Sequence, residues 1–599
     1  MAEYRAPVKD MRFVLDTIAD IDGLAKLAGF EHVESDVVDA ILEEAAKFAG
    51  NVLAPLNRTG DLEGSHVADG VVTTPTGWVE AYQQFVEGGW NGVSAPEKFD
   101  GGGLPQALTL ATVEMWNAAN LAFSLCPLLT QGAIESLLKH GTGAQQEKYL
   151  RKLISGEWSA TMNLTEPQAG SDVGALRTKA EPAEDGTWRI SGQKIFITYG
   201  EHEMAENIIH LVLARTPGAP AGTRGISLFI VPKYLVNDDG TLGPRNDLLC
   251  VSLEEKIGIH ASPTAVMSYG DNGNCVGYLL GEENKGMACM FTMMNNARLN
   301  VGLQGLAISE RALQHAVAYA RERRQGQAPG MSKGESATIV QHADVRRMLM
   351  TMRANVEAMR CLIYLNGAAL DRAHHEADAA ARQKAMGLAE LLTPLSKAWC
   401  TDLGVEMASL AVQVHGGMGF IEETGVGQYY RDARILPIYE GTNGIQALDL
   451  VGRKLSLQGG EPVRDLLAEI ATTVKSLADA GGEMAVMSVQ LDLAYSALQE
   501  ATDWMYANAP NDPNAAPAGA TPYLRMFATT VGAHLLGRSA LRARTLLREG
   551  GDDAAFLTAK IVTARFFMAH ILPTATALLG PVTDGPETLF AIDEEQLSA

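Results

Sequence analysis

Residues 431–450 read RDARILPIYEGTNGIQALDL, and they place one carboxylate between an apolar run and the start of a helix. The apolar run ends directly before Glu440, a glycine follows it, and apolar residues then recur at helical spacing. Asn443 with Gln446 three residues later predicts a capping box, so we expect the helix to begin there. Glu440 would then lie one short turn before a helix.

This position makes Glu440 a candidate catalytic base. An apolar setting raises the pKa of a carboxyl group, which makes its carboxylate a usable base near neutral pH. Most glutamates in turns nevertheless have a structural role, so this stretch alone does not assign a function. The rest of the chain has to decide between the two readings.

Composition limits the classes of function. The chain has 599 residues, of which 47% are apolar and 20% charged, and its formal net charge is −23. This length suits three or four domains, or one large multi-layer unit with a sizeable core. The strongly acidic balance argues against nucleic acid and anionic membranes as partners, because both require concentrated Lys and Arg.

The cysteines and the N-terminus indicate a compartment. The six cysteines form no CxxC and no spacing typical of zinc or disulfide frameworks, which favours a reducing cytoplasm and no metal site. The N-terminus, MAEYRAPVKDMRF, lacks the pattern of a signal peptide. No run approaches the roughly 20 apolar residues of a transmembrane helix. We therefore expect a cytoplasmic protein without a membrane span.

Hydrophobic periodicity predicts four segments in an α+β arrangement. Residues 1–158 are helical, with a helix break near Pro127, and 159–284 form a β-domain. Residues 285–457 form a helical bundle that carries Glu440, and 458–599 form a C-terminal helical extension. The short strands predict an antiparallel barrel or sandwich, with a loop at 237–247. The expected strands are 188–198, 207–214, 225–231, 250–253, 265–269 and 276–280.

Common catalytic motifs are missing. The sequence has no GxGxxG after a strand, no GxxxxGK[ST], no HExxH and no GxSxG. Rossmann dinucleotide binding, P-loop chemistry, zinc proteolysis and serine hydrolysis are therefore unsupported.

Four polar stretches remain, and their joint order is informative. They are LTEPQAGSD at 164–172, KIFIT at 194–198, RERR at 321–324 and QVHGGMGF at 413–420. Each alone is an ordinary loop, strand or helix end. Together with RxxxGLxxxA at 298–307 and the YEGT of the opening stretch, they resemble the acyl-CoA dehydrogenases over roughly residues 35–455. The remainder resembles a longer subfamily of about 600 residues.

The resemblance implies a helical domain, a β-domain and a helical bundle with FAD bound between them. It implies that Glu440 removes the α-proton of an acyl-CoA while the β-hydride passes to the flavin. The backbone N–H of Glu440 would hydrogen-bond the thioester oxygen, and Gly441 would leave that amide accessible. Electron-transfer flavoprotein would accept the electrons, and the chain would form a homodimer or a higher homo-oligomer.

The resemblance also implies site residues. The expected substrate contacts are Ser171, Asn295, Arg298 and Gly441. Gln413, Gly416, Gly417 and Arg323 would reach the FAD of a neighbouring subunit, and Thr442 would bind a flavin phosphate at a helix N-terminus. The other expected FAD contacts are Met162, Leu164, Thr165, Gly170, Ser171, Phe196 and Thr198.

The acyl group is less constrained than the chemistry. The phrases GIHASP at 258–263 and NNARL at 295–299 most resemble the subfamily that oxidises 3-(methylthio)propanoyl-CoA. A dehydrogenase of fatty acyl-CoA and an acyl-CoA oxidase are the alternative enzymes. A DNA-binding flavoprotein relative is a more distant alternative, against which the net charge argues. A degenerate, non-enzymatic relative would not be expected to retain Glu440, Arg323 and the flavin loop.

Overall fold

The computed structural model describes residues 3–332, 334–551 and 553–598. Its internal contacts divide the chain into two units. The β unit contains Lys47–Leu104 and Ala119–Asn300, and the helical unit contains Met1–Ala46, Pro105–Ala118 and Val301–Ala599. Each unit is described by itself.

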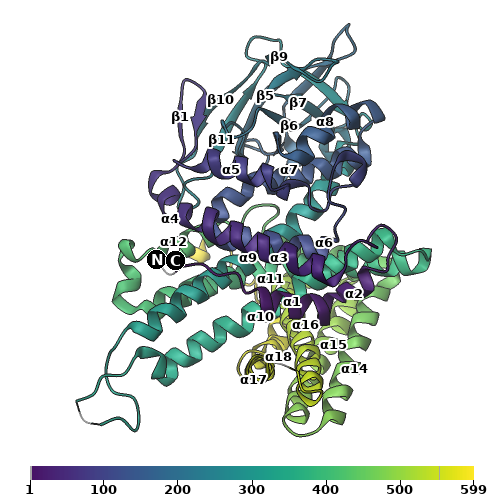
Figure 1. Cartoon of the computed structure of the whole chain (residues 1–599). Helices are drawn as coiled ribbons and strands as arrows, with labels where there is room; N and C mark the ends of the chain where they lie inside the picture. The colour runs from purple at the N-terminus through teal and green to yellow at the C-terminus, as the bar shows by residue number, and fades with distance from the viewer. Residues whose placement is uncertain (1–2, 333, 552, 599) are drawn as a thin grey trace. The chain divides into compact units, whose positions relative to one another are not determined.

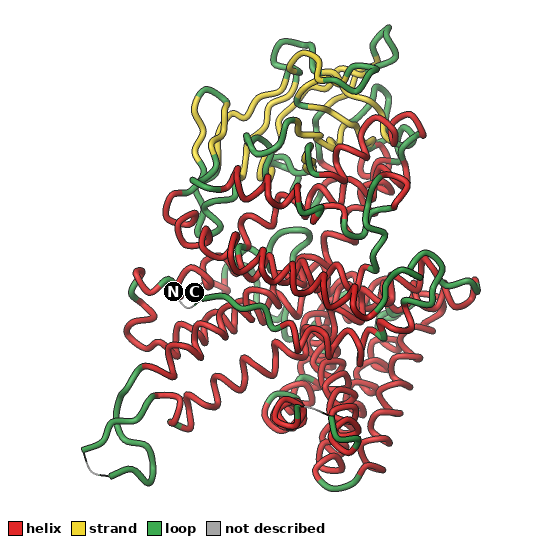
Figure 2. Tube along the Cα trace, viewed as in Figure 1, coloured by secondary structure: helices red, strands yellow, loops and turns green. Residues whose placement is uncertain are grey.

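The β unit is organised around one eight-stranded sheet, shown in yellow in Figure 2. The strand order is β10-β11-β5-β12-β7-β6-β3, and β4 pairs with β5. This sheet is open, not closed into a barrel, and β3 pairs parallel with β6 while its other pairs are antiparallel. The strands are β3 (Trp158–Asn163), β4 (Lys179–Pro182), β5 (Trp188–Thr198), β6 (Asn207–Ala214), β7 (Ser227–Pro232), β10 (Leu248–Leu253), β11 (Thr264–Tyr269) and β12 (Val276–Leu280).

Helices cover one face of this sheet (Figure 1). Helices α7 (Leu121–His140) and α8 (Gly143–Ser155) pack against β3, and their apolar side chains share a core with Trp158 and Leu211. The opposite face holds a second core that includes Ile190, Phe229 and Met267. The unit also contains α4 (Ala54–Glu63), α5 (Trp78–Glu87) and the hairpin of β1 (His66–Ala68) with β2 (Val71–Thr73).

Two local predictions were wrong. The helix break expected near Pro127 lies at Asn120, because the Asn120 side chain caps α7 by accepting a hydrogen bond from Phe123 N at 3.1 Å. The loop expected at 237–247 contains β9 (Leu242–Arg245), which pairs with β8 (Tyr234–Val236). Asp239 accepts hydrogen bonds from the backbone and hydroxyl of Thr241, and this local turn closes the hairpin.

Two stretches among the described residues are long and apolar enough to cross a membrane by composition. Helix α7 is one of them, and 83% of its apolar window is buried, as in the core helix of a globular protein. The other, Ala554–Thr583, is 44% buried and comprises three helices, α17 (Ala554–His570), α18 (Pro573–Ala577) and α19 (Leu579–Thr583). Both stretches are weak evidence for a membrane span.

The helical unit combines the bundle with the C-terminal extension. Helix α16 of the extension packs against α10, α11 and α13, so the extension belongs to the same compact unit as Glu440 (Figure 1). The main helices are α1 (Val8–Val14), α3 (Ser35–Phe48), α6 (Gln106–Ala119), α9 (Gly286–Glu322, whose residues up to Asn300 belong to the β unit), α10 (Ala343–His375), α11 (Ala379–His415), α12 (Val426–Ala433), α13 (Asn443–Asp449), α14 (Glu461–Ala480), α15 (Glu483–Asn508), α16 (Ala515–Arg548) and α17.

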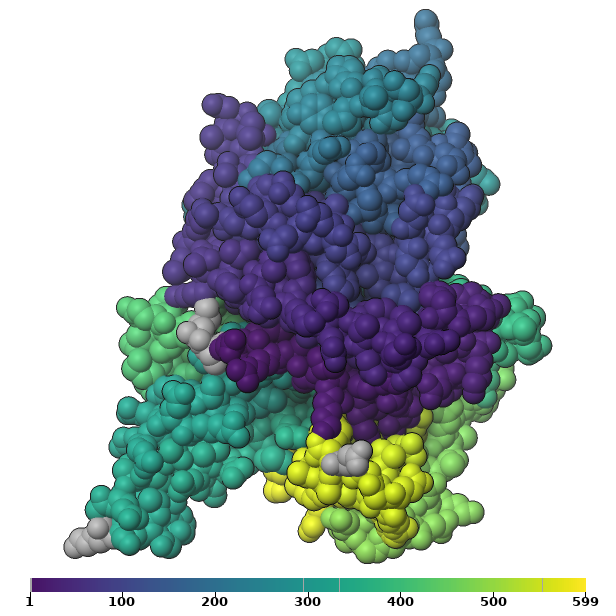
Figure 3. All heavy atoms as spheres, viewed as in Figure 1, coloured from purple at the N-terminus to yellow at the C-terminus, as the bar shows by residue number. Residues whose placement is uncertain are grey.

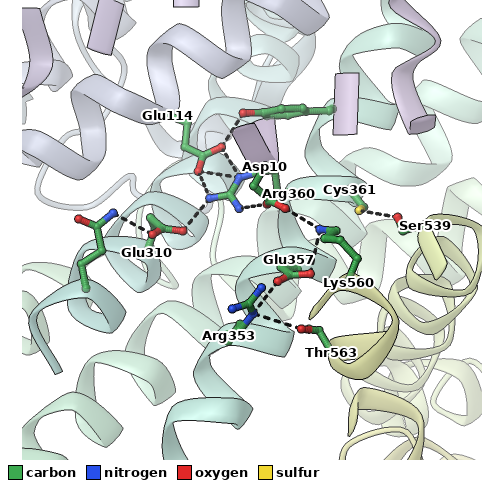
Figure 4. Close-up of polar contacts among 12 residues, drawn as sticks. Asp10, Glu114, Glu310, Arg353, Glu357, Arg360, Cys361, Ser539, Lys560 and Thr563 are labelled. Carbon is green, nitrogen blue, oxygen red and sulfur yellow. Dashed lines mark hydrogen bonds and ion pairs between the residues drawn. The ribbon is translucent and has the colours of Figure 1, made fainter. Parts of the chain in front are cut away.

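A buried ionic cluster joins five of these helices (Figure 4). Arg360 on α10 pairs with Glu114 on α6, with Glu310 on α9 at 2.8 Å and with Asp10 on α1. Lys560 on α17 pairs with the same Asp10 at 2.6 Å and with a glutamate of α10 at 2.8 Å. Buried charges are tolerated when each has a close partner of opposite sign, as here.

The cluster joins the two ends of the chain. Atoms of the N-terminal residues (purple) lie against those of the C-terminal helices (yellow) in Figure 3. Burial raises the pKa of Asp10, but the charges and hydrogen bonds of Lys560 and Arg360 outweigh it and hold the pKa at about 2. Asp10 is therefore an anion at neutral pH, held between one cation from the bundle and one from the extension.

We expect Lys560→Met to lower the free energy of unfolding by about 3–5 kcal/mol, because it leaves two buried carboxylates without this cation. Urea unfolding at neutral pH measures the change. Lys384→Met is the matched control, since Lys384 pairs with Asp465 at 3.0 Å on the surface of the same unit. The control should cost less than about 1 kcal/mol. An equal loss in both variants would contradict the role of the cluster.

Candidate active site

The turn that carries Glu440 has an unusual backbone. Glu440 has φ +54° and Gly441 has φ +86°, both in the left-handed region. Glycine adopts this conformation freely, but a glutamate there costs of order 1–3 kcal/mol and persists only where its surroundings hold it. The Glu440 side chain is half-buried. Strained residues of this kind are enriched at functional sites, which supports Glu440 as the functional carboxylate.

The capping box predicted from Asn443 and Gln446 was wrong, because the helix is capped one residue earlier and the residue three positions after that cap is Ile445, whose side chain cannot accept a hydrogen bond. Thr442 is the N-cap of α13, and its hydroxyl accepts a hydrogen bond from Ile445 N at 3.4 Å. Asn443 is the first helical residue, and its side chain is directed to α11 instead of capping its own helix. Gln446 Nε2 donates to the carbonyl of Gly441 at 3.3 Å.

The predicted flavin loop follows β3 in the β unit. Met162 is buried on β3, Leu164 and Thr165 are half-buried, and Gly170 and Ser171 are exposed. Hydrogen bonds join the loop to β5: Ile195 N donates to Thr165 O at 3.0 Å, and Lys194 Nζ donates to Leu164 O at 2.9 Å. The structure therefore brings together two motifs that are separated by more than twenty residues in the sequence.

A buried ion pair within this loop was missed by the sequence analysis. Lys194 Nζ lies 2.8 Å from Glu166 Oε1, and both side chains are almost fully buried. Glu166 also accepts hydrogen bonds from Arg177 N at 2.6 Å and Thr178 N at 3.0 Å. Glu166 lies in the stretch LTEPQAGSD at 164–172 and Lys194 begins the stretch KIFIT at 194–198. One acidic and one basic residue in two polar stretches were therefore the available sequence signal for this ion pair.

These contacts fix the charge state of the loop. Burial raises the pKa of Glu166, but the Lys194 charge and the hydrogen bonds outweigh it and lower the pKa to about 2. Burial lowers the pKa of Lys194 to about 8, against the opposing effect of Glu166. Around neutral pH both groups are charged, and they hold the loop against β5.

Phe196 lies in a β-bulge of β5. Lys194 pairs with Met267 and Ile197 pairs with Ala265, so two residues of β5 oppose a single residue of β11. Phe196 has φ +59°, and 58% of its surface is exposed. The bulge thus turns an aromatic ring out of the sheet, where a flat ligand can stack on it. Thr198 lies beyond the bulge, and its carbonyl accepts a hydrogen bond from Thr161 Oγ1 at 2.7 Å.

The other predicted residues are distributed over both units. Arg298 is buried on α9 in the β unit. Asn295 lies on the same helix, and its side chain is outside the described part of the structure. In the helical unit, the exposed residues are Arg323, directly after α9, and Gln413, Gly416 and Gly417 at the end of α11. Within the described ranges, no group of three or more His, Cys, Asp or Glu residues could hold a metal ion.

Comparison with protein families covers most of the chain. The models described as acyl-CoA dehydrogenase N-terminal, middle and C-terminal domains match residues 35–157, 161–269 and 284–455. A fourth, described as acetyl-CoA dehydrogenase C-terminal like, matches residues 466–593. A 3-methylmercaptopropionyl-CoA dehydrogenase of Ruegeria pomeroyi is 49% identical over 98% of this chain and 99% of its own.

The chain belongs to the acyl-CoA dehydrogenase family.

Two further comparisons agree. A butyryl-CoA dehydrogenase of Syntrophomonas wolfei is 36% identical, with 95% of each chain covered. The solved structure of a Bacillus anthracis acyl-CoA dehydrogenase complexed with FAD has a TM-score of 0.73 at 21% identity, and it covers 94% of this chain and 89% of its own. The predicted family fold is confirmed. As a member of this family, the chain is a flavin-dependent oxidoreductase that acts on acyl-CoA thioesters.

The residues of the β unit fit a flavin. The exposed segment at 170–171 presents backbone amides and a hydroxyl, and a Cβ atom added to Gly170 would meet nothing within 4 Å. The ring of Phe196 is exposed in a strained backbone. A polar ring edge requires such hydrogen-bonding groups, and a planar ring system requires an accessible flat surface.

We expect Glu166→Gln to lower the free energy of unfolding at pH 7 by about 2–3 kcal/mol. The pKa of Glu166 is about 2 in the folded chain, below its ordinary value of 4.5. Its stabilising contribution is therefore complete above pH 4.5 and is lost as the pH falls towards 2. The deficit of the variant should narrow over that window in urea unfolding followed by tryptophan fluorescence.

Glu181→Gln, on the exposed side of β4, is the matched control for this experiment. It should unfold like the wild type at every pH. A deficit of Glu166→Gln that stays constant between pH 5 and 3 would show that its carboxylate does not contribute through the ion pair.

Proposed function

We propose that this chain is an FAD-dependent dehydrogenase that oxidises 3-(methylthio)propanoyl-CoA to 3-(methylthio)acryloyl-CoA. The observation that supports this substrate is the 49% identity, over 98% of the chain, to a 3-methylmercaptopropionyl-CoA dehydrogenase. This similarity extends beyond the motifs common to the family and therefore supports the same acyl group. The reaction would belong to the degradation of dimethylsulfoniopropionate.

Glu440 is the catalytic base in this proposal. Its carboxylate accepts the α-proton of the thioester, and its backbone N–H donates a hydrogen bond to the thioester carbonyl oxygen, where negative charge develops. Gly441 has no side chain to obstruct that amide. A flavin bound by these residues would supply the hydride acceptor, so that the substrate would lose an α-proton to Glu440 and a β-hydride to the cofactor and gain a carbon–carbon double bond.

The remaining roles are proposed residue by residue. Ser171, Asn295 and Arg298 contact the substrate together with Gly441, and Thr442 contacts a flavin phosphate. Arg323, Gln413, Gly416 and Gly417 contact the FAD of a second subunit. The residues proposed for the flavin ring system are Met162, Leu164, Thr165, Gly170, Ser171, Phe196 and Thr198.

The proposed assembly is a homodimer or a higher homo-oligomer in the cytoplasm, with electron-transfer flavoprotein as the acceptor. Exposed Arg323, Gln413 and Gly416 support it, because these side chains and amides are available to a neighbouring subunit. The division of the chain after residues 158, 284 and 457 is also a proposal.

Glu440→Gln should retain flavin and lower kcat by about 10²–10⁴-fold, because glutamine keeps the size of the side chain but cannot accept a proton. Flavin content comes from the visible absorbance of the purified protein, and kcat from an artificial electron acceptor. Glu423→Gln, an exposed glutamate close in the sequence, is the control and should keep wild-type kcat. Wild-type turnover in Glu440→Gln would refute the assignment of the base.

A dehydrogenase of short fatty acyl-CoA is the second candidate, favoured by the 36% identity to a butyryl-CoA dehydrogenase. Pentanoyl-CoA separates the two, because it carries a methylene in place of the sulfur of 3-(methylthio)propanoyl-CoA. We expect kcat/KM to be at least about 10-fold higher for the sulfur substrate, since a fitted pocket discriminates by about 1–3 kcal/mol at one such group. Equal values for the two thioesters, or a preference for butyryl-CoA, would favour the second candidate.

A further inference from the structure

The turn around Glu440 is held from both sides by neutral groups. On the N-terminal side, the Tyr439 hydroxyl donates to Gln304 Oε1 on α9. Burial, and then the charge of Glu440, raise the pKa of Tyr439 well above its ordinary value, so its hydroxyl keeps its proton. On the C-terminal side, Asn443 N donates to Pro437 O at 3.0 Å and closes the turn.

The Asn443 side chain ties the same turn to α11. Its Oδ1 accepts a hydrogen bond from Lys397 Nζ at 2.9 Å. Its Nδ2 donates to Asp402 Oδ1 at 2.7 Å and to Ala398 O at 3.1 Å. Thr401 Oγ1 lies 2.9 Å from Nδ2 and completes the set. Four residues from adjacent turns of one helix thus surround a single amide.

This arrangement specifies the orientation of the amide. An ammonium group can only donate hydrogen bonds and a carboxylate can only accept them, so Lys397 selects Oδ1 and Asp402 selects Nδ2. Lys397 is fully buried. Burial raises the pKa of Asp402, while the hydrogen bond from Asn443 and the charge of Arg525 lower it. If the amide were rotated, its NH₂ group would face the ammonium of Lys397 and its oxygen would face the carboxyl group of Asp402. The observed orientation is therefore strongly favoured, and we call this set of hydrogen bonds the Asn443 anchor.

The C-terminal extension contacts the residues of the Asn443 anchor through helix α16. Arg525 on α16 pairs with Glu406 on α11 at 2.8 Å. Arg525 and Thr521 line a cavity of about 60 Å³ together with Asp402 and Asn443. The extension therefore contacts the helix that Asn443 begins and the helix to which Asn443 is tied.

We propose that Asn443 is a positioning residue, which holds the left-handed backbone at Glu440 so that its carboxylate is aimed for proton abstraction. The inference rests on the proposed role of Glu440. A strained residue keeps its conformation only when its flanks are held, and the flanks here are Tyr439 and Asn443. Misplacement of a catalytic group by about 1 Å can cost 10²-fold in rate, so loss of this tie is expected to affect chemistry more than substrate binding.

Asn443→Ala should lower kcat by about 10–100-fold, with KM changed less than about 3-fold and flavin content unchanged. Asn366→Ala is the matched control, because Asn366 is also a buried asparagine, on α10, and its Nδ2 donates to Ser396 on α11 at 3.1 Å. The control should lose thermal stability but keep its kcat. If Asn443→Ala does not fold, Asn443→Ser decides, since a hydroxyl cannot reach both Lys397 and Asp402. A wild-type kcat in the folded variant overturns the inference.

A double-mutant cycle separates positioning from general damage. The readout is single-turnover reduction of the bound flavin by acyl-CoA, measured as loss of its visible absorbance. If Asn443 acts through the Glu440 carboxylate, Asn443→Ala should slow the residual rate of Glu440→Gln by less than about 2-fold. Losses that multiply in the double variant overturn the inference. Wild-type turnover in Glu440→Gln alone would instead refute the proposed function, and with it the role of Asn443 that depends on Glu440.

Discussion

The left-handed backbone at Glu440 is the constraint on which the candidate active site depends. An unfavourable conformation of order 1–3 kcal/mol has to be offset by contacts elsewhere, and here they come from α9 through Gln304 and from α11 through the amide of Asn443. Phe196 in the β unit shows the same solution, where pairing on both sides of a bulge holds a non-glycine residue at positive φ. In each unit, a residue with a proposed direct role occupies a conformation that the fold imposes.

The hydrogen bonds of Gln304 and Asn443 can hold the turn only if α9, α10 and α11 keep fixed positions relative to one another. Arg360 and Lys560 contribute to it by joining α10 to α1, α6, α9 and α17 through buried ion pairs. A buried ion pair contributes little net stability compared with apolar packing, but it strongly disfavours any arrangement that separates its partners. Because the C-terminal extension supplies Lys560 and Arg525, it is part of the frame that holds the turn at Glu440.

Sequence patterns predicted the regular parts of this structure well. Strands β5, β6 and β12 have the expected bounds, because their β-branched residues alternate or cluster between clear turn signals. Strand β3 was missed since its sequence, WSATMN, contains a single β-branched residue and therefore gives a weak strand signal. The pairing of Glu166 with Lys194 and the anchoring of Asn443 on α11 depend on tertiary contacts between distant segments. Local patterns carry no information about such contacts, and Asn443 was therefore misread as a helix cap.

The chemical nature of the two anchors fits the task of a base. A cation in direct contact with a carboxylate lowers its pKa and weakens it as a proton acceptor. The neutral amide of Asn443 lies between the ammonium of Lys397, which donates to its oxygen, and the carboxyl group of Asp402, which accepts from its nitrogen. The protonated hydroxyl of Tyr439 is likewise neutral. Tyr439 and Asn443 thus hold the turn through uncharged groups. They fix the position of Glu440 without themselves adding a charge beside it.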